Sequence, residues 1–192
     1  SEVTIVCDKF SNPEWVASDL IGQAEHDILA QCILISKDKK LLEKVRIEIF
    51  KQLKKIPRES IAQKSLMNNG ILMHVSSEKK IIDIVNKIGP EHLELNVKNY
   101  RTFVSKIKNA GSICLGKYAV MGMSDYNIGT NHTLPTNSSA RYSSGISVNE
   151  FYKRISYINL SKKGIKTLGP SVITLANYEG LVGHARSVEK RI

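Results

Sequence analysis

The chain has 192 residues, of which 42% are hydrophobic and 24% are charged, a globular composition that excludes collagen-like, low-complexity and wholly disordered chains. No apolar run approaches the roughly 18–20 residues of a membrane-spanning helix, so the sequence excludes a bilayer-spanning role. The 28 Lys and Arg residues against 18 Asp and Glu residues give a net charge of +10, which leaves a nucleic-acid or anionic partner open until the charge pattern is considered.

Along residues 1–116, short apolar runs alternate with amphipathic stretches, a pattern typical of strands alternating with helices. Asn12 and Pro13 mark a helix start, because Asn is a favoured N-cap and Pro is favoured at the first helical position. The predicted strands are Val3–Cys7, Gln31–Ser36, Ile71–Val75, Leu93–Val97 and Ser112–Leu115. The predicted helices run from Asn12 to about His26, from Lys39 to Lys55, from there to Asn69, from Ser77 to Ile88, and over Tyr100–Ile107. This order predicts an α/β fold with an open, mostly parallel, Rossmann-like sheet and helices on both faces.

The pattern changes after Gly116. Residues 117–145 are rich in Gly, Ser, Asn and Thr, and so long an irregular stretch that contains Asp125, His132 and Pro135 favours a functional segment. We predict an α/β domain over residues 1–146 and a small, mainly helical carboxyl-terminal tail over residues 147–192. In the tail, Arg154–Leu160 is a strand candidate, and a last helix is predicted from Gly169–Pro170 towards Ile192.

The charges and the cysteines have simple interpretations. Lys outnumbers Arg 21 to 7 and aromatic residues make up 6%, whereas nucleic-acid sites usually combine Arg with aromatic side chains. The densest basic stretch, residues 37–58, includes Glu43 and Glu48 and is typical of a solvated helix face. Cys7, Cys32 and Cys114 lie far apart in apolar runs, which predicts buried, unpaired thiols of the cytoplasm. We therefore predict no nucleic-acid and no membrane partner.

Four of the five histidines lie beside carboxylates or amides, whereas His74 lies in an apolar strand and is predicted to be structural. Gln23 and His26 are three residues apart, so on a helix they share a face and could bind one ion. Asp125 and an imidazole from His26 or His184 complete a nitrogen and oxygen set that suits zinc, manganese or cobalt.

Two further pairs are candidates for proton transfer or binding. Glu91 and His92 follow a Gly–Pro turn and supply titratable groups of different pKa. Glu179 and His184 are five residues apart, roughly 140° around an ideal helix. They share no face unless Gly180 and Gly183 distort the helix, or unless they touch opposite sides of a ligand. The chain contains no Gly-x-Gly-x-x-Gly, no P-loop and no Gly-x-Ser-x-Gly motif.

Several of these residues lie in longer motifs with a fixed order. The motifs are Gln23-Ala-Glu-His26, Gly89-Pro90-Glu91-His92-Leu93, Ala110-Gly111-Ser112, Asp125-Tyr126 with Gly129-Thr130-Asn131-His132-Thr133-Leu134-Pro135-Thr136, and Glu179-Gly180-Leu181 with His184. Together they resemble the histidinol dehydrogenase family over the whole chain. The opening Ser1-Glu2-Val3 is similar to the end of that family's Gly-Pro-Ser-Glu-Val segment.

The resemblance implies a zinc- and NAD-dependent oxidation of L-histidinol to L-histidine in two steps through the aldehyde. It implies His92 as the general base and Glu91 as the group that activates water for hydration of the aldehyde. The implied zinc ligands, which would orient the substrate through its imidazole and amino nitrogens, are Gln23, His26, Asp125 and His184.

The resemblance also implies a cytoplasmic homodimer of histidine biosynthesis whose carboxyl-terminal tail crosses to the neighbouring subunit. His132 would support the loop or the site. The implied substrate contacts are Ser1, Gln23, His26, His92, Asp125, Glu179 and His184.

The family has a long segment before its Ser-Glu-Val motif, and the NAD contacts are expected there rather than in this chain. We therefore expect these 192 residues to be part of a longer enzyme and to be inactive alone. The alternatives are a catalytically inactive remnant and a zinc-dependent hydrolase in which Glu91 acts as the base for a zinc-bound water.

Overall fold

Five apolar strands form one sheet in the computed structural model, which describes residues 1–192. All neighbouring strands are parallel, in the order β3-β2-β1-β4-β5. The strands are β1 (Glu2–Cys7), β2 (Gln31–Ser36), β3 (Gly70–His74), β4 (His92–Asn96) and β5 (Ser112–Leu115). The predicted parallel α/β architecture is confirmed, and the strand order reverses direction between β1 and β4.

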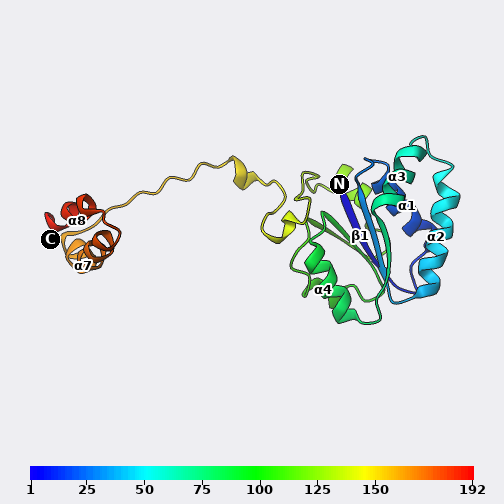
Figure 1. Cartoon of the computed structure of the whole chain (residues 1–192), viewed down its shortest axis with the longest axis horizontal. Coiled ribbons are helices and arrows are strands. Elements are labelled where there is room, and N and C mark those ends of the chain that lie inside the picture. The colour runs from blue at the N-terminus through cyan, green and yellow to red at the C-terminus, as the bar shows by residue number, and fades with distance from the viewer. The chain divides into compact units, whose positions relative to one another are not determined.

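Helices cover both faces of this sheet, as predicted (Figure 1). On one face, α1 (Pro13–Ala24), α2 (Lys39–Leu53) and α3 (Glu59–Asn69) enclose a core with Val3, Ile5 and Leu34. On the other face, α4 (Glu78–Ile88) and α5 (Arg101–Val104) pack with Ile35, Leu93 and Leu95. The strand β2 is therefore mainly apolar on both faces, as a buried parallel strand requires, whereas β4 presents buried polar side chains, His92, Glu94 and Asn96, on one face.

Side-chain caps fix where the main helices begin. The Asn12 side chain accepts the N–H of Glu14 at the start of α1, and Pro13 follows it. Asp38 accepts the N–H groups of Lys40 and Leu41 at the start of α2. Helix α4 ends at Gly89, whose φ of 58° is left-handed and favours glycine. The predicted cap at Asn12 is therefore confirmed.

The segment after β5 contains more structure than the sequence predicts. A short helix, α6 (Met121–Tyr126), lies within it, together with two 3₁₀ turns, η1 (Ser139–Arg141) and η2 (Val148–Phe151). Six residues are too few to show a helical period of apolar side chains, so α6 was not predicted. Its first N–H group is held by the buried carboxyl of Glu94, a contact distant in sequence.

The chain divides into two units, Ser1–Glu150 and Phe151–Ile192. The second contains α7 (Lys162–Tyr178) and α8 (Val182–Glu189), which pack closely: a Cβ at Gly169 would lie 2.7 Å from Ile192 Cδ1. The domain boundary near residue 146 stays a prediction. No helix of the chain combines the length and the apolar character needed to cross a bilayer.

Two predictions in this second unit are wrong. Residues 154–160 form no strand, because their side chains are exposed and no neighbouring strand pairs with them. The last helix does not begin at Gly169–Pro170. It begins after Ser161, whose hydroxyl accepts the N–H of Gly164, and Pro170 lies inside it. A break at Glu179–Leu181 then separates α7 from α8.

Candidate functional site

Polar side chains from four parts of the chain converge at the amino end of the sheet. They come from the start of β1, the end of α1, the start of β4 and helix α6. The turn from α4 into β4 is fixed by Gly89 and by two backbone hydrogen bonds of 2.9 Å, from Gly111 N–H to the Pro90 carbonyl and from Ser112 N–H to the Glu91 carbonyl. A Cβ at Gly111 would lie 2.6 Å from the Glu91 carbonyl oxygen, so this close approach requires glycine.

Glu91 joins β4 to the start of β1. Its side chain is buried, and its Oε2 accepts the backbone N–H of Glu2 at 2.8 Å. Ser1, next to Glu2, is exposed and remains at this end of the sheet because its carbonyl accepts the N–H of Gln31. Ser1 therefore adjoins the residue whose backbone N–H binds Glu91.

His92 lies between two carboxylates. Its side chain is 4% exposed, and its Nε2 is 3.8 Å from Asp125 Oδ2 and 4.0 Å from Glu91 Oε1. Burial lowers the pKa of His92, the carboxylates of Asp125 and Glu91 oppose that shift, and His26 adds to it. The imidazole is therefore neutral near pH 7 and can accept a proton, as a general base must.

Gln23 and His26 lie at the end of α1. Gln23 is fully buried, yet neither its Oε1 nor its Nε2 has a hydrogen-bond partner. His26 follows α1, is exposed, and donates its backbone N–H to the Gln23 carbonyl at 3.3 Å. An amide that is completely buried without a partner costs about 1–3 kcal/mol, which indicates that a ligand completes this site.

Asp125 is carried by α6. Its Oδ2 faces His92, and its Oδ1 is buried without a partner. Ser124, next to it, is held through its hydroxyl to Thr130 Oγ1 at 3.0 Å and to Ser112 Oγ at 3.4 Å. The loop that the sequence marked as functional therefore brings a carboxylate to the first residues of β4.

The unpartnered atoms at this end have the chemistry of metal ligands. Gln23 Oε1 and Asp125 Oδ1 are oxygen donors, and the imidazole of His26 supplies nitrogen. No group of three or more His, Cys, Asp or Glu side chains is arranged to hold a metal ion in the structure. The donor types and the buried orphan atoms nevertheless fit a cation such as zinc.

Glu179 and His184 lie in the second unit. Glu179 ends α7, His184 lies in the first turn of α8, and both are exposed. Gly180, with a φ of 76°, turns the chain between them. The angle of roughly 140° expected for a single helix therefore does not apply, because Glu179 caps α7 and His184 lies in α8.

The two remaining histidines have no contact with this group. His132 is exposed in the loop after α6. His74 ends the edge strand β3, where its Nε2 pairs with the Lys37 carbonyl at 3.2 Å. His74 therefore has a hydrogen-bond partner, as the structural interpretation requires, although its side chain is exposed.

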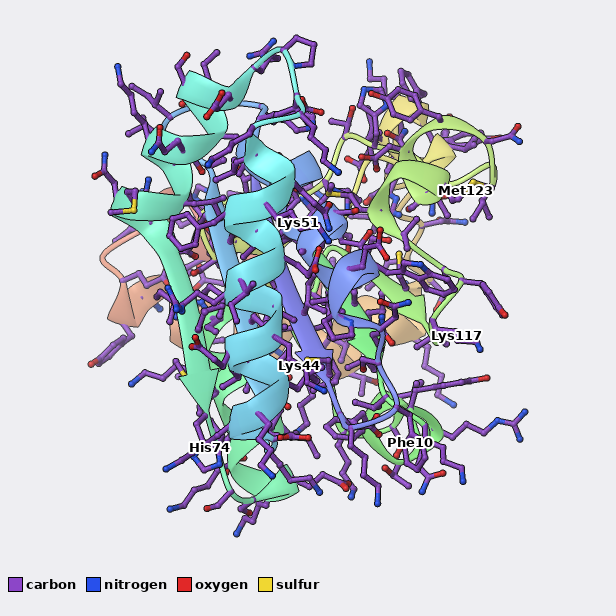
Figure 2. All side chains as sticks on the ribbon, turned by 90° about the vertical axis from the view of Figure 1, so that its right-hand side faces the viewer. Phe10, Lys44, Lys51, His74, Lys117 and Met123 are labelled. Carbon is purple, nitrogen blue, oxygen red and sulfur yellow. The ribbon has the colours of Figure 1, made fainter.

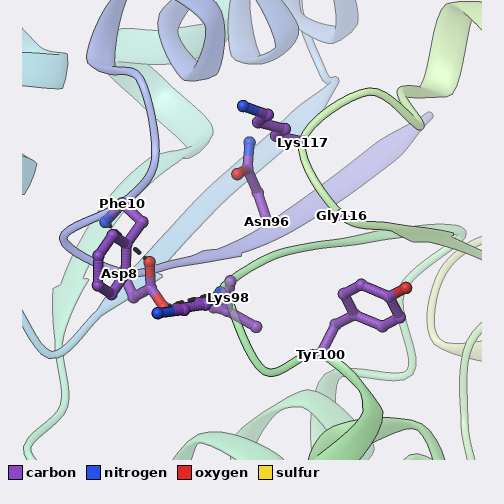
Figure 3. Close-up of a pocket in the computed structure, with 8 residues that line it drawn as sticks. Asp8, Phe10, Asn96, Lys98, Tyr100, Gly116 and Lys117 are labelled. Carbon is purple, nitrogen blue, oxygen red and sulfur yellow. Dashed lines mark hydrogen bonds between the residues drawn. The ribbon is translucent and has the colours of Figure 1, made fainter.

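The carboxyl end of the sheet, opposite this group of residues, contains a pocket. Figure 2 shows Phe10 and His74 where the strands end, and Met123 of α6 towards the other end. A pocket of about 410 Å³ lies there, between the loops that follow β1, β4 and β5 (Figure 3). Asp8 closes it on one side, since its two carboxylate oxygens accept the N–H groups of Phe10 and Lys98 at 2.9 Å.

In dinucleotide-binding α/β folds, a glycine-rich turn after the first strand brings the pyrophosphate to a helix N-terminus. Here that turn, residues 8–12, has no glycine. Asn12 already caps α1, and Glu14 puts a negative charge in its first turn. The turn after β1 therefore lacks the pyrophosphate-binding fingerprint of those folds.

Sequence reasoning missed one buried pair at the centre of the sheet, next to these residues. Asp19 of α1 faces Glu94 of β4, and Glu94 also binds α6. The only signal in the sequence is a glutamate in the middle of the apolar run His92–Asn96, a position that is buried in a parallel sheet.

Comparisons with known proteins agree with the motifs. A family model described as Histidinol dehydrogenase matches residues 1–192. The chain is 80% identical over 192 residues to the histidinol dehydrogenase of Pelagibacter ubique and covers 45% of that protein. It is 44% identical over 192 residues to that of Methanocaldococcus jannaschii, of which it covers 44%.

A solved structure also matches. The crystal structure of histidinol dehydrogenase from Elizabethkingia anophelis has a TM-score of 0.88 and 40% sequence identity, covering 100% of this chain and 44% of that one. The chain therefore spans less than half the length of the relatives it matches.

Proposed function

The chain belongs to the histidinol dehydrogenase family, and we propose that it supplies the metal and proton-transfer residues for the oxidation of L-histidinol to L-histidine in two NAD-dependent steps. The observation that carries this proposal is the buried His92, held neutral by its surroundings and facing the carboxylates of Glu91 and Asp125. A neutral imidazole in that position can accept the proton of an alcohol as a hydride leaves the adjacent carbon.

His92 and Glu91 divide the proton transfers between them. In the first step His92 takes the hydroxyl proton of histidinol, and the carbon that bears the hydroxyl loses a hydride and becomes an aldehyde carbon. Glu91 then takes a proton from water as the water oxygen adds to the aldehyde. The hydrate anion that results loses a second hydride and its remaining hydroxyl proton to give the carboxylate. NAD, when bound, accepts the hydride in each step.

Gln23, His26 and Asp125 would hold a zinc ion at the amino end of the sheet, with His184 as a further ligand. Bound zinc supplies a positive centre that fixes the imidazole and amino nitrogens of the substrate. The orphan atoms of Gln23 and Asp125 support this assignment, because each needs a partner that the protein itself does not provide.

Ser1 and Glu179 are proposed as further substrate contacts, together with the ligand residues and His92. In a homodimer, the second unit of one subunit would bring Glu179 and His184 to the site of its neighbour. No residue of this chain is assigned to NAD, and the absence of a glycine-rich turn after β1 is consistent with that. NAD contacts are proposed to lie outside these residues.

We place the enzyme in the cytoplasm and in histidine biosynthesis. The three cysteines are free and buried, as expected of a reduced compartment. The hydrolase alternative has no support from the family match, which covers the whole chain.

A hybrid protein tests the proposal. The amino-terminal remainder of the Pelagibacter ubique relative is joined to this chain at the matched position, and NADH formation from L-histidinol is measured with zinc present. We expect the hybrid to form two NADH per histidinol and the 192-residue chain alone to form none. NADH formation by the chain alone would contradict the expected inactivity, and a hybrid that folds and binds zinc but forms no NADH would contradict the proposed function.

A further inference from the structure

Glu94 is a buried carboxyl that the proposed chemistry does not use. It lies in the middle of β4, in register with Ile5 of β1, and is 2% exposed. It faces α1, where Asp19 approaches it closely enough for a hydrogen bond between the two carboxyl groups. An apolar side chain at position 94 would avoid the desolvation free energy of a buried carboxyl, which suggests that Glu94 has a functional role.

The other contact of Glu94 reaches the loop that carries Asp125. Glu94 Oε1 accepts the backbone N–H of Met121 at 2.9 Å, and this hydrogen bond is buried. Met121 is the first residue of α6, and Asp125 lies one turn later on the same helix. Glu94 and His92 are two residues apart on one strand, so they point to the same face of the sheet. One strand therefore holds both His92 and the helix that presents a carboxylate to it.

The protonation state of Glu94 and Asp19 is compatible with a hydrogen bond that holds α6 in place. Burial and the neighbouring Asp19 raise the pKa of Glu94 to about 8, and burial raises that of Asp19 to about 6. Near pH 7 the Glu94 carboxyl is therefore protonated, and with Oε1 engaged by Met121 its proton can be donated to Asp19. Cys114, which also lies near Glu94, has a pKa of about 12 and is neutral as well. Glu94 thus adds no negative charge beside Asp125.

We infer that Glu94 is a positioning residue, whose hydrogen bond to the Met121 N–H sets α6 so that Asp125 faces His92 and the metal position. This inference rests on the proposed function, because it assigns Glu94 a role towards the same site. Asp19 orients the Glu94 carboxyl by accepting a hydrogen bond from its O–H group. The Ser124 hydroxyl contacts hold the other end of α6, so the helix is fixed at both ends.

Two variants of similar size separate the hydrogen bond from simple packing. Glu94→Gln keeps an oxygen for Met121 and supplies an N–H group for Asp19, so it mimics the protonated acid. Glu94→Met fills the same space without an acceptor. Glu94→Asp keeps the acid but withdraws it by one methylene group. Ser65→Ala, which loses one buried hydrogen bond to the Ala30 carbonyl far from α6, is the matched control.

The first measurement is amide hydrogen exchange of the metal-free 192-residue chain. We expect Glu94→Met and Glu94→Asp to speed exchange selectively over residues 121–126, while Glu94→Gln and Ser65→Ala leave that segment at the wild-type rate relative to β2. The second measurement is the zinc affinity of the same variants, determined by competition with a chelator. We expect Glu94→Met to weaken zinc binding about tenfold, the effect typical of a group that orients a ligand, and Glu94→Gln to restore it.

Equal exchange of α6 in wild type and Glu94→Met would overturn the inference, as would a loss in Glu94→Gln as large as in Glu94→Met. If Glu94→Met does not fold, the comparison of Glu94→Asp with Glu94→Gln decides by the same exchange criterion. Failure of the wild-type chain and of the hybrid to bind zinc would contradict the proposed metal site instead, and the exchange of α6 would still decide the role of Glu94.

Discussion

The two ends of the parallel sheet differ in whether their buried polar groups have partners. At the carboxyl end, both oxygens of Asp8 accept backbone N–H groups, and Ser11 and Ser36 donate their hydroxyl groups to the Asn96 and Cys7 carbonyls. At the amino end, atoms of Gln23, His92 and Asp125 are buried without partners. The carboxyl end is stabilised by its own contacts, whereas the amino end holds unpartnered atoms that a bound ligand would satisfy.

This difference shows that fold alone is a poor guide to the site. Open parallel sheets usually bind ligands at their carboxyl ends, where the strand order reverses. That point lies between β1 and β4 here, and a pocket is present beside it. The turn after β1 nevertheless contains no glycine, while the unpartnered buried groups of metal-ligand type lie at the opposite end.

Substitutions at the two ends of β4 test directly which end of the sheet carries the site. His92 and Asn96 are both buried in β4, at its two ends. In the hybrid enzyme, His92→Ala is expected to lower kcat by about 10²–10⁴-fold, because the general base is lost. Asn96→Ala is expected to leave kcat unchanged. Steady-state rates of NADH formation measure both, and a larger loss from Asn96→Ala would reverse the assignment of the two ends.

Orphan and satisfied groups predict stability changes of opposite sign. Gln23→Met removes a buried amide without partners, so the metal-free chain is expected to gain about 1 kcal/mol in its free energy of unfolding. The same variant is expected to lose zinc affinity. Ser36→Ala removes a satisfied hydroxyl at the carboxyl end and is expected to lose about 1 kcal/mol. Urea unfolding and zinc competition supply the two readouts, and destabilisation by Gln23→Met would show that its amide has a partner in the protein.

The buried pair at the centre of the sheet predicts a dependence of stability on pH. The folded-state pKa of Glu94 is raised from 4.5 to about 8, so the folded protein binds a proton that the unfolded chain releases between these values. Stability from this group is complete below pH 4.5 and is lost as the pH rises towards 8. Asp19, with a pKa of about 6, acts in the same direction, and the nearby Cys114 thiol stays neutral.

Glu94→Gln removes this titration. The loss of unfolding free energy between pH 4.5 and about 8 is therefore expected to be smaller in the variant than in wild type. Urea unfolding of both proteins at a series of pH values across this range measures the loss. Identical slopes in the two proteins would mean that Glu94 is not protonated in the folded state.

The smallest effect is expected in the pocket of Figure 3, where Lys98 and Lys117 line the wall. Lys98→Ala and Lys117→Ala, made in the hybrid enzyme, are expected to change kcat/KM for histidinol and for NAD by less than about twofold, the range of surface substitutions. A tenfold rise in the KM for NAD would place the dinucleotide at the carboxyl end after all.

The sequence predicts the fold well where local patterns determine it. The apolar runs, the Asn12 cap and the Gly89 end all agree with the structure, since each depends on neighbouring residues. Helix α6 could not be predicted, because its first N–H is held by Glu94, 27 residues earlier. The candidate residues came from short motifs, but their convergence needed the parallel register that brings His92 beside Val3.

A zinc titration followed by ¹H–¹⁵N NMR of the 192-residue chain tests the central claim most directly. If the amino end of the sheet is the site, the resonances of Gln23, His26, His92 and Asp125 shift together, while those of Asp8, Asn96 and Lys98 stay in place. Shifts confined to the residues at the carboxyl end, or no shifts at saturating zinc, would contradict it.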